Sequence, residues 1–322
     1  MKYTVRTSPH VRSEDTTARL MGDVVIALIP TIAAGALLFG LRALTVTAVC
    51  ALGALAGEAV FRLTAGRPQT IHDRSAAVTG LLLAMTLPAA VPYWLAGLGG
   101  FLSTFLFKGL CGGLGQNAFN PALVTRALLL LLWPVHVTRY PPAGARLPLF
   151  GPVDAVSSAT PLHEMQMPAL PHVSLWDLFV GNVGGCIGEV SSLALLLGGM
   201  YLLARRVIRP HIPLAYVGST ALLTLLFSRG QPPLLWMAYN LLGGGILLGA
   251  FFMATDYATS PVTPKGQLVY GAGCGALTVL FRYTGLFPEG FTYAILFMNA
   301  AAWAIDRYTP PRRFGTQKGA PS

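Results

Sequence analysis

Residues 24–61, VVIALIPTIAAGALLFGLRALTVTAVCALGALAGEAVF, decide the fold class. Arg42 and Glu58 are the only charged residues in this stretch. It is long enough for two passages across a bilayer, because about 20 apolar residues span the hydrocarbon core. The first apolar run begins near Val24, too far in and too long for an ordinary cleavable signal. We therefore expect two retained transmembrane helices close to the N-terminus.

The composition of the whole chain agrees with this interpretation. Hydrophobic residues make up 54% of the 322 positions and charged residues only 11%, whereas a soluble domain carries about 25% charged residues. The net charge of +10 lies in short basic clusters between apolar runs, which excludes nucleic acid as a partner and leaves membrane lipid. The four cysteines form no C-x-x-C pair and the six histidines have no metal-ligand spacing, so no metal site is predicted.

We expect an all-α, polytopic membrane protein with about ten transmembrane helices, some of them broken or half-helices. Residues 1–322 would form a single membrane domain. The expected spans are 24–39, 43–61, 76–87 with a continuation past Pro88, 94–107, 121–133, 178–204, 214–227, 234–254, 268–281 and 291–305. Five plus five spans would allow an inverted repeat, although the sequence contains no convincing direct repeat.

The distribution of basic residues predicts the orientation. If the N-terminus is cytoplasmic and the spans alternate, sixteen Lys and Arg residues fall inside and five outside, while Arg126 lies within a span. This bias follows the positive-inside rule. Both termini are therefore predicted to be cytoplasmic in a bacterial inner membrane. The polar segment 134–176 is predicted to be a periplasmic loop, too long for a simple connector.

Two spans look interrupted. Pro88 and Pro92 break the third span, while Asn120 and Pro121 have the residue types of an N-cap and a first helical position. The apolar run that follows, 121–133, would be roughly 20 Å long at 1.5 Å per residue, short of the roughly 30 Å core. We expect a half-helix there, and broken helices of this kind often build binding sites in membrane proteins.

The loop 134–176 contains the sequence Asp154-Ala155-Val156-Ser157-Ser158-Ala159-Thr160-Pro161-Leu162. From residue chemistry alone, this is best interpreted as a Ser/Thr turn before Pro161. The hydroxyls and small residues would also leave the chain accessible to a modifying enzyme, with Thr160 as acceptor.

The same segment resembles the flavinylation motif of the D subunit of Rnf complexes and of the B subunit of the Na⁺-translocating NADH:quinone oxidoreductase. Other stretches resemble signatures of this family in the same order along nearly the whole chain. They are residues 73–81, 112–123, 187–192, 252–256, 288–290 and 295–299. The short N-terminus before Val24 favours the Rnf protein over its longer relative.

The resemblance implies that Thr160 carries FMN through a phosphoester bond. Asp154, Ser157 and Ala159 would be recognition positions for the flavin transferase, and Ser158 stands where Gly is commoner. The chain would pass electrons as one component of an oxidoreductase that also has A, B, C, E and G subunits, receiving them from the flavin of the G subunit. The complex would link ferredoxin and NAD to Na⁺ or H⁺ transport. A non-covalent riboflavin, reported in the quinone-reductase relative, has no site that we can assign from the sequence.

Ion movement requires polar groups within the membrane. Glu189 lies inside an expected span, where an unpaired charge costs on the order of 2.5–3.5 kcal/mol. Glu58 and Asp256 lie near span ends, and Arg126 lies in the expected half-helix. These four residues are candidates for the ion pathway. The alternative is a structural ion pair, such as Glu189 with Arg126, or simple snorkelling.

Glycines at i, i+4 spacing at Gly181 and Gly185, Gly184 and Gly188, and Gly245 and Gly249 indicate close helix packing. Close approach to a flavin ring is the alternative interpretation of the same spacing.

Two other functions compete with the redox interpretation. A solute transporter or channel without a redox cofactor would also have broken helices and buried acids. Asn120-Pro121-Ala122 matches the aquaporin tripeptide, but the second copy that an aquaporin needs is missing. A purely structural component with an unmodified Thr160 is the third possibility. Neither the coupling ion nor the choice between ferredoxin and a redox-sensing regulator can be predicted from the sequence.

Overall fold

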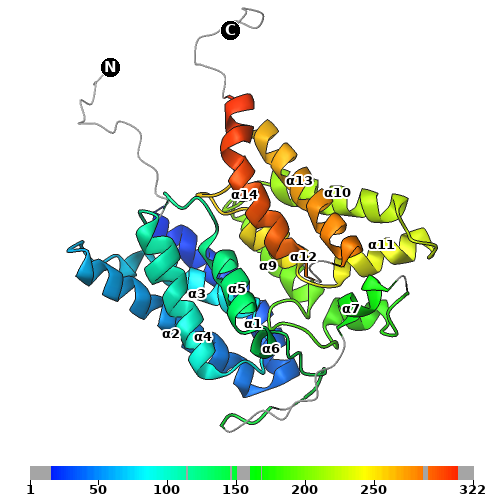
Figure 1. The fold of residues 1–322 in the computed structure, drawn as a ribbon, viewed down its shortest axis with the longest axis horizontal. Coiled ribbons are helices and arrows are strands. Elements are labelled where there is room, and N and C mark those ends of the chain that lie inside the picture. The colour runs from blue at the N-terminus through cyan, green and yellow to red at the C-terminus, as the bar shows by residue number, and fades with distance from the viewer. Residues whose placement is uncertain are drawn as a thin grey trace, which may run out of the picture.

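The computed structural model describes residues 16–113, 115–145, 147–150, 160–167, 169–285 and 289–310. These residues form helices joined by turns and extended segments, which confirms the predicted all-α class. Figure 1 shows α1–α5 on one side of the molecule and α9–α14 on the other, with the short helices α6 and α7 at one end. The motif residues Asp154, Ser157 and Ala159 lie outside the described residues.

The N-terminal helices are α1 (Thr17–Phe39) and α2 (Leu41–Thr64). They reverse direction at Gly40, whose φ of 76° is readily adopted only by glycine. Among the described residues, these two are the uninterrupted helices long and apolar enough to cross a membrane. They confirm the two spans expected from residues 24–61, whereas the total of about ten crossings stays a prediction.

The next elements are η1 (Ile71–Asp73), α3 (Ser75–Met85), α4 (Tyr93–Leu102) and its π-helical continuation η2 (Ser103–Gly109). Small residues let α4 approach α2 closely: a Cβ added to Gly100 would lie 2.1 Å from the Cys50 carbonyl oxygen. The third span is broken at Pro88 as predicted, because residues 86–92 leave the helical conformation. This break brings non-helical backbone into the interior of the protein.

Helix α5 (Pro121–Leu132) begins as the sequence predicted. The Asn120 side-chain oxygen accepts hydrogen bonds from the backbone N–H groups of Ala122 (3.0 Å) and Leu123 (3.4 Å), and Pro121 is the first helical residue. Twelve residues make this a half-helix by length, roughly 18 Å at 1.5 Å per residue. It is followed by α6 (Pro134–Val137) and, after the segment outside the description, by α7 (Pro161–Gln166).

The C-terminal part contains α8 (Leu175–Val180), α9 (Ser192–Ala204), α10 (His211–Leu226) and α11 (Pro233–Leu242). The chain continues through α12 (Ile246–Leu248), the π-helical η3 (Gly249–Met253), α13 (Pro264–Thr284) and α14 (Phe291–Tyr308). Within the N-terminal part α2 packs on α4, and within the C-terminal part α10 packs on α13 in the same way. Between the two parts, α1 contacts α9 and α5 contacts α14. An inverted five-plus-five repeat would produce such matched packing, and the repeat stays a prediction.

Two expected spans, 178–204 and 234–254, are broken where we predicted continuous helices. Residues 181–191 form an irregular segment between α8 and α9, starting at Gly181 with φ 115°. Helix α11 and residues 246–253 meet at 61°, across Gly244 with φ 72°. The predicted helix packing of the 181–188 glycines is therefore wrong. They lie in the irregular segment, where glycine permits both the positive φ and the close contacts.

The breaks at 86–92 and 181–191 provide hydrogen-bond partners for each other's backbone groups. The N–H of Ile187 donates to the Leu87 carbonyl and that of Gly188 to the Met85 carbonyl, both at 2.9 Å, beside an antiparallel bridge between Pro88 and Cys186. Non-helical backbone within a membrane needs such internal partners, because no water is available there. The end of α3 thus fixes the segment before α9.

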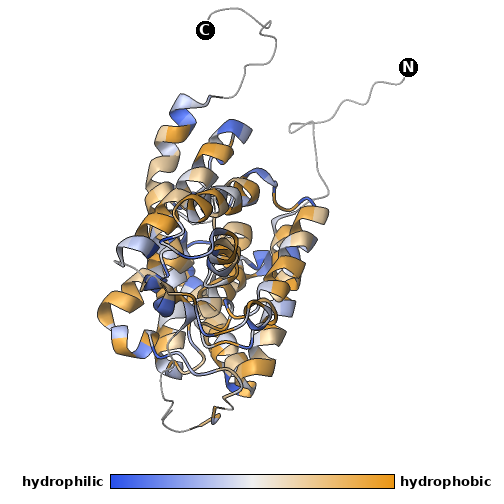
Figure 2. Ribbon diagram, turned by 90° about the vertical axis from the view of Figure 1, so that its right-hand side faces the viewer, coloured by the Kyte–Doolittle hydropathy of each residue, from blue (hydrophilic) through white to orange (hydrophobic). Residues whose placement is uncertain are grey.

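Exposed apolar side chains cover the outer helix faces. Leu37 is 88% exposed, Leu131 78% and Trp303 71%, and Figure 2 shows hydrophobic residues along most of the helices. An apolar exterior around buried charged groups is the reverse of a soluble surface, and it fits contact with lipid.

Candidate functional site

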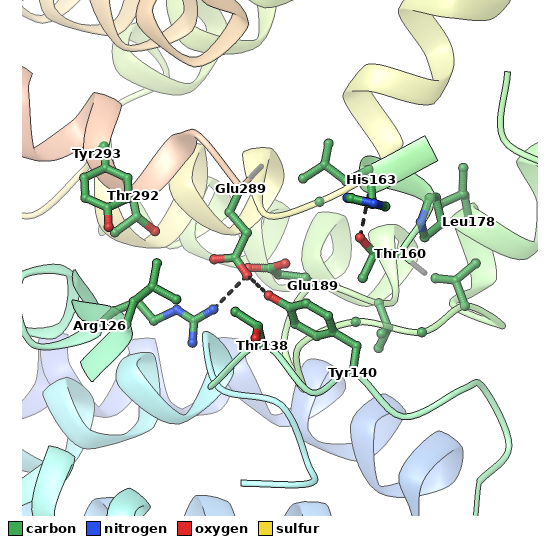
Figure 3. A pocket seen from close by; sticks show the side chains of 18 of the residues that line it. Arg126, Thr138, Tyr140, Thr160, His163, Leu178, Glu189, Glu289, Thr292 and Tyr293 are labelled. Carbon is green, nitrogen blue, oxygen red and sulfur yellow. Dashed lines mark hydrogen bonds and ion pairs between the residues drawn. The ribbon is translucent and has the colours of Figure 1, made fainter. Parts of the chain in front are cut away.

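A cavity of about 450 Å³ lies between the two parts of the molecule. It is lined by the half-helix α5, the start of α7, the irregular segment before α9, and the residues around the start of α14. Figure 3 shows its polar residues, with Glu289 between Arg126 and Thr160. Binding sites for drug-sized ligands measure about 300–1,000 Å³, so this cavity is large enough for a cofactor.

Thr160 is in the cavity wall and is the N-cap of α7. Its hydroxyl oxygen accepts a hydrogen bond from the backbone N–H of His163 at 3.3 Å, and Pro161 follows as the first helical residue. The Ser/Thr turn predicted before Pro161 lies largely outside the described residues, so it stays a prediction. The N-cap bond holds the Thr160 hydroxyl at the cavity, where a group attached to that oxygen has space to lie.

The segment after Thr160 is fixed to the helices behind it. Arg229 donates to the Gln166 carbonyl at 3.2 Å and to the Tyr283 carbonyl at 2.8 Å, and the Tyr239 hydroxyl donates to the Val173 carbonyl at 2.7 Å. These bonds tie α7 and the chain that follows it to α11 and α13, so Thr160 has a rigid support.

Arg126, Glu289 and Tyr140 form a polar network in the cavity wall, in which Arg126 is buried and the other two are half-buried. A guanidinium nitrogen of Arg126 (Nη2) donates to Glu289 Oε1 at 2.7 Å, and the Tyr140 hydroxyl donates to the same oxygen at 2.5 Å. Burial first, and then the Glu289 carboxylate, raise the pKa of Tyr140, which keeps the phenol protonated as a donor. Arg126 is 1% exposed, so the network fixes its position in the cavity wall.

The Arg126 partner differs from the one considered in the sequence analysis. Glu289, which precedes α14, takes the guanidinium in place of Glu189. The Glu189 side chain lies in the irregular segment 181–191 and is 8% exposed. Its Oε1 has no hydrogen-bond partner among the described residues. It also lines the cavity, so the structure brings Glu189, Arg126 and Thr160 together.

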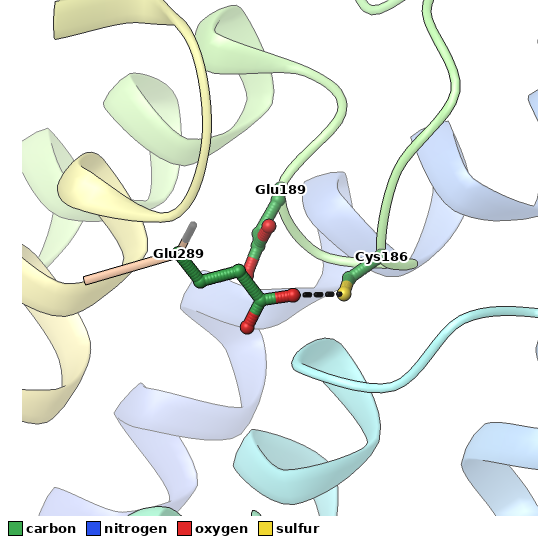
Figure 4. A group of neighbouring side chains, drawn as sticks. All are labelled: Cys186, Glu189 and Glu289. Atoms are coloured by element: carbon green, nitrogen blue, oxygen red, sulfur yellow. Dashed lines mark hydrogen bonds between the residues drawn. The ribbon is translucent and has the colours of Figure 1, made fainter. Parts of the chain in front are cut away.

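Cys186, Glu189 and Glu289 have their ligand atoms within 4.8 Å of one another (Figure 4). A thiol and two carboxylates at these distances could coordinate a metal ion. However, the Cys186 thiol and the Arg126 guanidinium both donate to Glu289 Oε1. Arg126 already supplies the positive charge at that oxygen, and a metal ion there would meet it at close range. We therefore assign no metal to this cluster.

The remaining ion-pathway candidates do not line this cavity. Glu58 is 3% exposed and accepts from Lys108 at 3.0 Å and from the Thr70 hydroxyl at 2.7 Å, with Arg62 at 3.6 Å. This is the structural ion pair that we considered as its alternative role.

Asp256 follows η3 and accepts from the Ala258 N–H and the Thr259 hydroxyl. It lines a second, smaller cavity of about 90 Å³ together with Lys108, Asn117 and Asn120.

Sequence reasoning missed Glu289 and Tyr140 as site residues. Residues 288–290 were noticed only as part of a family signature, and Tyr140 only as part of a long loop. The informative signal was a charged residue just before an apolar run, since Glu289 stands two positions before α14. Its partner Arg126 is 163 residues away in the chain, so the pairing could not be inferred from local spacing.

Comparisons with known proteins show the family of the chain. A model of the NQR2, RnfD, RnfE family matches residues 4–315. The D subunit of the Na⁺-translocating ferredoxin:NAD⁺ oxidoreductase complex of Acetobacterium woodii is 45% identical, over 99% of this chain and 97% of the relative. The D subunit of the proton-translocating complex of Clostridium ljungdahlii is 38% identical over 98% and 97%. The D subunit of the ion-translocating oxidoreductase complex of Marinobacter nauticus is 38% identical over 99% and 97%.

Proposed function

The chain belongs to the NQR2, RnfD, RnfE family, and from this membership we propose that it is the D subunit of an Rnf-type ferredoxin:NAD⁺ oxidoreductase. In this role it is a membrane component of an ion-translocating electron-transport complex and bears FMN on Thr160. The similarity to two D subunits over nearly their whole lengths supports the assignment.

The observation that carries the flavin proposal is the position of Thr160. The residue that matches the family's attachment threonine lies in the wall of the 450 Å³ cavity, partly exposed and with its hydroxyl oriented by the N-cap bond. The hydrogen-bonded side chains of Arg126, Glu289 and Tyr140 line the same space. Such a cavity with a few placed polar groups suits a cofactor. FMN supplies one- and two-electron transfer, while the protein supplies position and electrostatics.

Glu189 is the acid best placed to couple ion movement to redox chemistry at this site. Its Oε1 is buried without a hydrogen-bond partner among the described residues, whereas Glu58 is engaged with Lys108. The relatives do not indicate the coupling ion, because one complex is called Na⁺-translocating and another proton-translocating. Asp256 and Arg126 remain weaker candidates for the ion pathway.

The proposed topology places both termini in the cytoplasm and the 134–176 loop in the periplasm, as the positive-inside count predicts. Thr160 would then receive electrons at the outer face from the G subunit, within a complex that also contains the A, B, C and E subunits. A flavin transferase would attach the FMN. A second, non-covalent riboflavin stays a prediction without an assigned site.

A solute transporter without a cofactor is the second candidate, because broken helices and a polar cavity would suit it as well. The two functions differ in whether Thr160 carries a covalent flavin. The test is in-gel flavin fluorescence of protein made in a host with a flavin transferase, for wild type, Thr160→Ala and the control Thr138→Ala. Thr138 is a second threonine in the same cavity wall, outside the motif.

Fluorescence in wild type and Thr138→Ala, but not in Thr160→Ala, supports the redox function. A dark wild-type band beside a fluorescent flavinylated standard would refute it and favour the transporter.

A further inference from the structure

Arg126 presents buried hydrogen-bond donors that the protein itself does not use. Its Nη2 group contacts Glu289 at 2.7 Å and the Cys186 sulfur at 3.8 Å. Nε and Nη1 have no hydrogen-bond partner among the described residues. These two nitrogens carry three of the five N–H donors of a guanidinium. Leaving buried donors unpaired is costly, and most of all for a charged group, so an acceptor is expected beside them.

Arg126 itself lies in the wall of the cavity that also contains Thr160. Arg126 and Thr160 both line this space, and Figure 3 shows them on opposite sides of Glu289. Arg126 cannot swing away easily, because Glu289 holds one of its nitrogens and Tyr140 holds Glu289. A ligand attached at Thr160 and extending across the cavity would reach a fixed cation.

We propose that Arg126 binds the pyrimidine edge of the flavin ring carried by Thr160 and stabilises its reduced form. This inference rests on the proposed function. Two-electron reduction with uptake of one proton at N5 leaves one negative charge on the N1–C2=O edge of the ring, and the electrons come from the redox partner in the complex. The hydrogen bonds from Arg126 to the ring would become stronger on reduction, because hydrogen bonds to charged groups are stronger than those between neutral groups.

This role differs from a place in the ion pathway, since Arg126 would set the midpoint potential of the flavin. Glu289 would act as a positioning residue, because its carboxylate holds Nη2 and leaves Nε and Nη1 without a hydrogen-bond partner among the described residues. It also partly cancels the charge of Arg126. Removing Glu289 should therefore raise the potential, whereas removing the pair should lower it.

The test compares the flavin midpoint potential in purified wild type, Glu289→Gln and the double variant Arg126→Met with Glu289→Gln. The double variant replaces a buried pair by neutral side chains of similar size, a change that proteins often tolerate. In-gel fluorescence first verifies that each protein carries the covalent flavin. We expect the oxidised-to-reduced ratio of the double variant to rise at least tenfold at a fixed potential, a shift of about 30 mV for a two-electron couple. Glu289→Gln should shift in the opposite direction.

Equal potentials in wild type and the double variant, with fluorescence retained, would overturn the proposal and indicate that water occupies the Arg126 donors. Shifts of the same sign in both variants would also overturn it, because they would indicate a general loss of packing. Loss of fluorescence in the double variant alone would overturn it as well, by assigning Arg126 to attachment or folding. A dark wild-type protein would instead refute the proposed function.

Discussion

The buried pair of Lys108 and Glu58 should be a structural element that can be replaced by neutral side chains. Both side chains are 4% exposed, and the Lys108 Nζ donates to Glu58 at 3.0 Å and to the Ser75 hydroxyl at 2.6 Å. Breaking a buried pair by removing one partner typically costs 3–5 kcal/mol, whereas removing both charges is often neutral. Arg62 lies 3.6 Å from the same carboxylate and Thr70 donates to it, so some compensation remains.

We therefore expect Lys108→Met to lower the free energy of unfolding by about 3 kcal/mol, the lower end of that range. The double variant with Glu58→Gln should recover most of this loss, giving a coupling energy of at least about 1 kcal/mol in a double-mutant cycle.

Thiol labelling during denaturation gives a direct assay. Cys50, Cys186 and Cys274 are buried while Cys111 is exposed, so a Cys111→Ala background reports unfolding alone. A double variant no more stable than Lys108→Met would refute the reasoning. A double variant that is stable but has lost ion transport in the assembled complex would return Glu58 to the ion pathway.

Two further substitutions test how the broken spans are built. Gly188→Val should prevent folding, because a Cβ at Gly188 would lie 2.4 Å from the Cβ of Met85. The control Gly218→Val should fold, because a Cβ at Gly218 would have nothing within 4 Å. Size-exclusion profiles in detergent compare the two variants, and a monodisperse Gly188→Val protein would contradict the close approach. Asn120→Ala should cost at least about 1 kcal/mol, because it removes the N-cap of α5 and the hydrogen bond from Nδ2 to the Met253 carbonyl. The loss is measured as a lower midpoint of thiol labelling. Asn120→Ser also lacks Nδ2 but keeps a capping oxygen, so it should lose less, and an equal loss in both variants would contradict the capping role.

The parts of the fold that depend on local sequence could be predicted. The paired apolar runs of residues 24–61 gave α1 and α2, and the Asn120-Pro121 pair gave the start of α5, because N-cap chemistry acts over a few residues. The breaks at 181–191 and 243–245 were missed. Glycines within an apolar run keep its hydropathy high, so bilayer-length counting cannot distinguish a continuous helix from a broken one.

The candidate site likewise has a part that the sequence predicted and a part that it did not. Thr160 was identified through its motif, and the structure places it in a cavity wall. Glu189 with Arg126, the pair named as an example of a structural alternative, does not form, and Glu289 is the ion-pair partner of Arg126. Which acid reaches Arg126 depends on how segments 63 and 163 residues further along the chain fold against it, and no periodicity in the sequence records this.

The most direct test of the account is peptide mass spectrometry of protein made with a flavin transferase. Ser157, Ser158 and Thr160 lie in one short stretch, so fragmentation of the peptide that contains them can assign the modified oxygen. The account predicts an FMN phosphoester on Thr160 and unmodified serines. An unmodified peptide, or FMN on either serine, would contradict it.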